Sequence, residues 1–186
     1  MPPRVGMSPE VDGAAAVDTG RAVRENRRRP ELHGPRGSSR GAAMNRYGLE
    51  FHHFGLAVRS PETAFRYLGD LGYRAGSTCY DPLQKVNLAM RHHDRMPDVE
   101  VIWPGAEPSP IDLMLKQNDS LIYHICYTSE DVERSLTALE QAGLEVMPLG
   151  FPQPALLFDG IEVSFHRITG VGVIEIIAGV PARGQA

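Results

Sequence analysis

The sequence is poor in cysteine and has no long apolar run, and each absence excludes a class of protein. Its two cysteines, Cys79 and Cys126, cannot build a disulfide framework, which favours a reducing compartment such as the cytoplasm. No stretch of about 18 consecutive apolar residues occurs, so no membrane-spanning helix is expected. The sequence also lacks a P-loop, a dinucleotide-binding fingerprint and the Gly-x-Ser-x-Gly and Cys-x-x-Cys motifs.

Acidic residues outnumber basic ones, but the two signs of charge are unevenly distributed. Residues 1–46 hold nine arginines against five acidic residues, whereas residues 47–186 hold ten basic against eighteen acidic residues. The excess of acidic residues over 47–186 argues against nucleic acid as a partner. Because the first segment also lacks apolar periodicity, we expect residues 1–46 to be a disordered basic leader and residues 47–180 to form the folded domain.

The hydrophobic pattern of the folded domain is repeated. Each half has a strand, then a helix capped by Ser60 or Ser129, then three strands. The expected strands cover residues 51–58, 73–80, 85–91 and 99–103 in the first half, and 121–128, about 144–149, 161–168 and 172–178 in the second. We therefore predict two β-α-β-β-β modules, over residues 49–105 and 118–179. One such module leaves a sheet face bare, so two must pack together to close a core.

Two histidines and two glutamates occupy equivalent places in these modules. His53 and His124 lie 71 residues apart in the two first strands, and Glu100 and Glu175 lie in the two last strands. Side chains alternate between the faces of a strand, so each glutamate points opposite to its apolar neighbours. If those neighbours pack under the helices, both glutamates face the concave side of the sheet.

The same alternation separates His53 from its neighbour His52. His53 shares its face with Gly55 and Ala57, whose small side chains leave room for a cavity, whereas His52 shares its face with large apolar residues. His53 is therefore the better ligand candidate. By the same reasoning His166, which shares a face with Ser164, is expected to line the cavity as a substrate contact or proton relay.

Two imidazoles and two carboxylates that converge on one point bind a borderline divalent ion, such as Co, Ni, Zn, Mn or Fe. Such a set leaves coordination positions open for water or substrate. A single histidine or glutamate in a strand is more often structural. The equivalent placement of both residue types in a duplicated unit is what predicts one shared metal site, with His53, Glu100, His124 and Glu175 as ligands.

The chain resembles the vicinal oxygen chelate superfamily in four sequence segments, at residues 52–58, 99–110, 123–128 and 170–177. The similarity is greatest to glyoxalase-like and methylmalonyl-CoA-epimerase-like members. This resemblance implies an α+β fold in which two βαβββ modules form a half-open barrel around a metal. It implies the same four ligands, with Glu100 more like glyoxalase I than like the epimerases, which commonly have glutamine there.

The resemblance also shows a departure from the epimerase pattern. Epimerases of this type are expected to use a second, non-ligand carboxylate on the strand that corresponds to residues 85–91 here. Our alignment places Leu88 there, with Asn87 beside it and no acidic residue within that strand. Those positions therefore lack the second base of a two-base mechanism, and Asn87 is predicted to bind substrate.

These observations predict a metal-dependent isomerase, epimerase or lyase. The resemblance implies that vicinal oxygens of a small substrate, such as an acyl-CoA or a 2-oxo compound, chelate the metal while Glu175, and also Glu100, serve as general base. The alternatives are a non-catalytic small-molecule binding or resistance protein and an extradiol-type dioxygenase. The sequence leaves open whether the protein is a monomer or a homodimer.

Overall fold

The computed structural model describes residues 45–179, and in these residues the chain forms one open, mixed sheet of nine strands. The expected disordered leader lies outside the described residues, apart from Asn45 and Arg46. The strands are β1 (Glu50–Val58), β2 (Arg74–Asp81), β3 (Val86–His92), β4 (Asp98–Pro104), β5 (Ser120–Ser129), β6 (Val146–Pro148), β7 (Gln153–Ala155), β8 (Ile161–Ile168) and β9 (Gly172–Ala178). The helices are α1 (Glu62–Asp70), α2 (Asp112–Leu115) and α3 (Val132–Gln141), with a 3₁₀ turn η1 (Leu156–Phe158).

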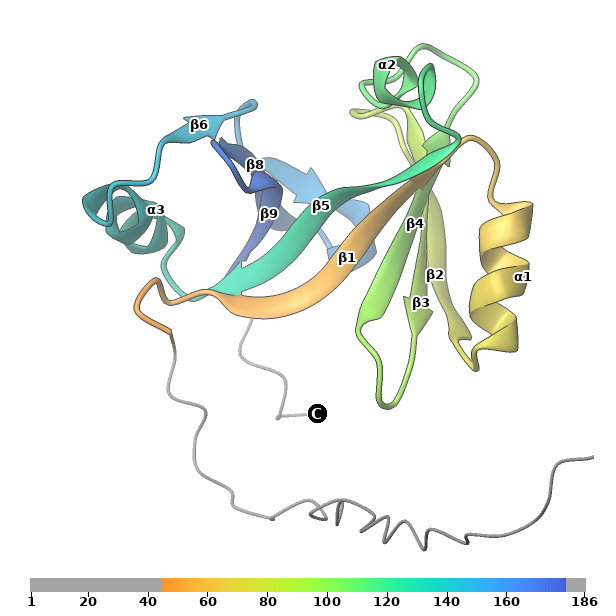
Figure 1. Cartoon of the computed structure of the whole chain (residues 1–186), viewed down its shortest axis with the longest axis horizontal. Helices are drawn as coiled ribbons and strands as arrows, with labels where there is room; N and C mark the ends of the chain where they lie inside the picture. Colours follow the sequence, from red (N-terminus) through yellow and green to blue (C-terminus); the bar gives the residue numbers. More distant parts are fainter. Residues whose placement is uncertain (1–44, 180–186) are drawn as a thin grey trace, which may run out of the picture. The chain divides into compact units, whose positions relative to one another are not determined.

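The sheet order is β2-β3-β4-β1-β5-β9-β8-β6, with β7 paired to β8. Strands β1 and β5 run antiparallel in the middle, where the two modules meet (Figure 1). Strand β1 pairs in parallel with β4, and β5 pairs in parallel with β9, so the pairing is the same in both modules. The expected α+β fold with two modules is confirmed, although the second module inserts β7 and η1 between β6 and β8.

Helices α1 and α3 each cover the apolar neighbours of one of the two glutamates. In the first module Leu68 of α1 packs with Val58 and Val101. In the second, Leu139 of α3 packs with Ile174 and Ile176. Because these apolar side chains lie under the helices, the glutamate between them is turned to the opposite face of the sheet.

The helix starts differ from the sequence-based expectation. Helix α1 begins after Pro61 and has no side-chain cap, so Ser60 does not cap it. The cap of α3 is Asp131, whose Oδ1 accepts a hydrogen bond from the backbone N–H of Arg134 at 2.9 Å. Ser129 instead shares a buried 2.8 Å hydrogen bond with Ser135. No helix within residues 45–179 is long and apolar enough to cross a membrane.

Candidate metal centre

The strand register brings the four predicted ligands together around the β1–β5 junction. Gly55 of β1 lies opposite Glu100 of β4 on one side and opposite His124 of β5 on the other. Cys126 of β5 lies opposite His53 on one side and opposite Glu175 of β9 on the other. The site is thus two adjacent rows across the sheet, and each row carries one histidine and one glutamate.

The four side chains converge closely and are all buried. Nε2 of His53 lies 3.6 Å from Oε2 of Glu100 and 3.5 Å from Oε2 of Glu175. Nε2 of His124 lies 3.5 and 3.3 Å from the same two oxygens. The two Nε2 atoms are 3.3 Å apart. One ligand atom from each residue therefore falls within 4.8 Å of all the others.

The electrostatics of this cluster suit a cation. Burial lowers the pKa of His124, but the Glu175 and Glu100 carboxylates outweigh it and raise that pKa above its ordinary value. Burial would raise the pKa of Glu175, but the His124 and His53 imidazoles lower it to about 2. Oε2 of Glu175 is buried and makes no hydrogen bond to any residue in the described range. A buried, unsatisfied carboxylate oxygen amid nitrogen and oxygen donors fits a divalent ion.

Gly55 supplies the space that the His124 ring occupies. A Cβ atom at this position would lie 2.5 Å from Nε2 and 2.6 Å from Nδ1 of His124, well inside van der Waals contact. The equivalent position of the second module is Cys126, 71 residues later, which is fully buried. Burial, together with the nearby Glu175 carboxylate, raises the pKa of the Cys126 thiol, which keeps it a neutral packing group.

His52 reaches the site, which strand alternation did not predict. The β1–β5 register shifts between Phe51 and His53, which marks a bulge. Nδ1 of His52 lies 2.8 Å from Nδ1 of His53, on the side of that ring away from the cluster. The His52 ring also meets the edge of Phe158, with centroids 5.5 Å apart. His52 is thus a neighbour of a candidate ligand, joined to it by a hydrogen bond.

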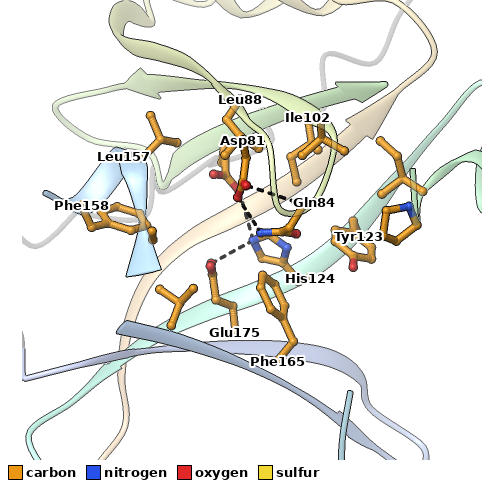
Figure 2. A pocket seen from close by; sticks show the side chains of 16 residues that line it. Asp81, Gln84, Leu88, Ile102, Tyr123, His124, Leu157, Phe158, Phe165 and Glu175 are labelled. Carbon is orange, nitrogen blue, oxygen red and sulfur yellow. Dashed lines mark hydrogen bonds and ion pairs between the residues drawn. The ribbon is translucent and has the colours of Figure 1, made fainter. Parts of the chain in front are cut away.

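An inner pocket of about 20 Å³ opens beside the cluster, between Glu100, His124 and Glu175. This volume is enough for one water molecule or one ion. Figure 2 shows the ring of His124 and the carboxylate of Glu175 turned toward each other, with Tyr123, Phe158 and Phe165 around them. Tyr123, which precedes His124 in β5, also lines this pocket.

The pocket contains a buried carboxylate that the sequence did not reveal. Asp81 lies at the end of β2, and its oxygens accept hydrogen bonds from the backbone N–H groups of Leu83 and Gln84 and from the Gln84 side chain. Its first role is therefore to hold the β2–β3 turn. A lone aspartate at a strand end is typical of a turn, so nothing in the pattern around Asp81 indicated that it lines a pocket.

The structure does not bring two other candidates into the pocket. Phe165 lies opposite Glu175, so its neighbour His166 points to the other face, where its Nε2 is 3.0 Å from Oγ of Ser164. Leu88 lies on the pocket face, so Asn87 points away and donates a 3.1 Å hydrogen bond to the carbonyl of Pro104. In both cases the strand register, which the sequence did not reveal, decides the face.

A family model described as the glyoxalase/bleomycin resistance protein/dioxygenase superfamily matches residues 52–165. The chain belongs to this superfamily. The matched segment includes His53, Glu100 and His124 but ends before Glu175. The resemblance to the vicinal oxygen chelate superfamily is thereby confirmed.

Solved structures of the superfamily share the fold at low sequence identity. A hypothetical protein from Bacillus halodurans is 21% identical, with a TM-score of 0.60 over 74% of this chain and 99% of that one. Methylmalonyl-CoA epimerase from Mycobacterium tuberculosis is 19% identical, with a TM-score of 0.58 over 72% and 89%. A Streptomyces coelicolor methylmalonyl-CoA epimerase variant in complex with 2-nitronate-propionyl-CoA is 18% identical, with a TM-score of 0.57 over 74% and 99%. None of the curated proteins compared matches the chain. At these identities the likeness establishes the fold alone.

Proposed function

We propose that this protein is a metal-dependent isomerase, epimerase or lyase that acts on a small substrate with two vicinal oxygens. The observation that supports this proposal most is the buried set of four converging ligands, two from each module. His53, Glu100, His124 and Glu175 would hold one divalent ion. When bound, such an ion supplies Lewis-acid polarisation of the substrate oxygens, which makes an adjacent C–H bond more acidic.

Glu175 is the proposed general base. Its Oε2 atom has no hydrogen bond within the described residues, and its lowered pKa means that the carboxylate is ionised at neutral pH. On leaving the ion, this oxygen would accept the carbon-bound proton. Glu100 is the second carboxylate of the cluster. Apolar side chains, among them Leu88, Ile102 and Phe165, line the rest of the pocket and exclude water from the proton being moved.

The pocket face of β3 favours chemistry with one base over chemistry with two. The chain has Leu88 there and no carboxylate. Within the described part of the chain, Asp81 is the only other acid that lines the inner pocket, and its oxygens already accept three hydrogen bonds. We therefore place isomerase or lyase chemistry ahead of two-base epimerisation. In an isomerase one carboxylate removes the proton and returns it to another atom of the substrate, and in a lyase one carboxylate removes the proton while a substituent on the adjacent carbon departs with its bonding electrons.

Metal titration combined with solvent exchange tests this proposal. Metal-free protein is given Co, Ni, Zn, Mn and Fe(II) in turn, and about one ion per chain should bind. The loaded protein is then incubated in D₂O with 2-oxo acids and acyl-CoA esters, and deuterium should enter the carbon next to the carbonyl. Metal binding and substrate binding without exchange would instead identify a binding protein. Oxygen consumption with a catechol would identify a dioxygenase.

A further inference from the structure

We infer that the substrate has an uncharged aromatic or aliphatic tail, which lies in a second pocket that adjoins the first. This inference rests on the proposed function, because it concerns the far end of the molecule whose oxygens would meet the metal. The second, outer pocket has a volume of about 300 Å³. That is within the range of ligand pockets, whereas the inner pocket holds little more than one small group.

The two pockets share one wall. Five residues line both of them: Gln84, Pro110, Tyr123, Val163 and Phe165. Phe165 lies directly opposite Glu175 in the sheet, and Tyr123 precedes His124 in β5. A ligand whose head reaches the cluster therefore has these shared side chains beside it as it leaves the inner pocket for the outer one.

Most side chains that line the outer pocket are apolar, and several of them are exposed, while the uncharged amides of Gln84 and Gln153 supply polar groups. Leu149 is 48% exposed and Phe151 is 91% exposed, and both lie between β6 and β7. Met114 of α2 and Leu83 of the β2–β3 turn complete the apolar surface. Large apolar side chains that converge on one pocket beside a candidate active site are typical of a surface that an apolar ligand covers.

The described residues that line the outer pocket carry no charge, and this favours an uncharged tail. Among residues 45–179, no aspartate, glutamate, lysine, arginine or histidine lines the outer pocket. A nucleotide or phosphate handle requires arginine, lysine or a helix N-terminus. Lys85, next to the shared residue Gln84, is paired with Glu107 at 2.8 Å. Helix α2 has only four residues and begins with Asp112, which disfavours an anion. The pocket thus fits an apolar tail and lacks the groups that a coenzyme A nucleotide needs.

Binding of matched 2-oxo acids tests the inference. Pyruvate, 2-oxooctanoate and phenylpyruvate share a head and differ in their tails. Calorimetry on Co-loaded protein should show 2-oxooctanoate or phenylpyruvate binding at least about tenfold more tightly than pyruvate, because each buried methylene adds affinity. Leu149→Lys should remove this gain and leave pyruvate binding unchanged. Ile122→Lys is the matched control, because Ile122 is 58% exposed and lines neither pocket.

Three outcomes would overturn the inference. The three acids could bind with equal affinity, none of them could bind, or acetyl-CoA could bind more tightly than they do and more tightly still to Leu149→Lys. The measurements are repeated on metal-free protein. A tail preference that persists there, with no metal bound by the untreated protein either, would overturn the proposed function and leave the outer pocket as an apolar binding site.

Discussion

Gly55→Ala tests the geometry of the candidate metal centre most directly. The added Cβ would lie 2.5 Å from Nε2 of His124, whereas ordinary contacts begin near 3.4 Å. The imidazole must therefore move by roughly 1 Å, several times the ~0.2 Å tolerance of a metal–ligand distance. Because a disturbed ligand environment typically costs 10–100-fold in metal affinity, we expect a loss of at least about 100-fold for this larger displacement.

The assay is competition between Gly55→Ala and a fluorescent zinc chelator, combined with thermal unfolding of the metal-free protein. Overpacking a buried site costs about 1–3 kcal/mol, so the melting temperature should also fall. Gly69→Ala is the control. A Cβ at Gly69 of α1 meets no atom within 4 Å, so this variant should bind zinc like the parent and gain up to about 1 kcal/mol of stability. Unchanged zinc affinity in Gly55→Ala would refute the placement of the His124 ring against Gly55.

Three further predictions concern the same site. Glu175→Gln should retain the fold and lower solvent deuterium exchange by about 10²–10⁴-fold, measured by mass spectrometry. Glu162 is exposed, so Glu162→Gln should exchange deuterium like the parent. Zinc affinity should fall as the pH is lowered through the raised pKa of His124, because only the deprotonated imidazole binds metal; calorimetry at pH 5.5 and 7.5 checks the sign. His52→Ala should weaken zinc binding by about 10–100-fold, because Nδ1 of His53 loses its hydrogen-bond partner. ¹⁵N NMR should then show a change in the His53 tautomer. An unchanged tautomer would exclude the role of His52 in orienting His53.

The parts of this fold that sequence analysis anticipated are those that periodicity governs. Alternation along β4 and β9 placed Glu100 and Glu175 opposite their apolar neighbours, and the packing of Val101 and Ile174 under the helices agrees. The duplication then indicated that the two histidines and the two glutamates form one shared site, and the four residues do converge. Local pattern was sufficient because each of these strands lies between a helix layer and an open face.

The parts that were not anticipated depend on register and on irregular backbone. His166 was expected on the pocket face, but β8 pairs with β9 so that Phe165 takes that place. His52 was expected to point away, but the bulge after Phe51 brings its ring against His53. A one-residue change in pairing exchanges the two faces of a strand, and a single sequence does not record which pairing the chain adopts.

Strands β1 and β5 meet at the centre of the sheet, and each module contributes two of the four ligands. Neither half of the domain therefore contains a complete ligand set. A fragment that ends before β5 would offer only His53 and Glu100, and a fragment that begins at β5 only His124 and Glu175. An ion held by all four would therefore act as a reversible cross-link between distant parts of the chain. At a free concentration of 100 times its dissociation constant, it would stabilise the joined halves by about 2.7 kcal/mol. Metal affinity is then also a measure of how firmly the two modules associate, and two separately produced modules would need each other to bind the ion.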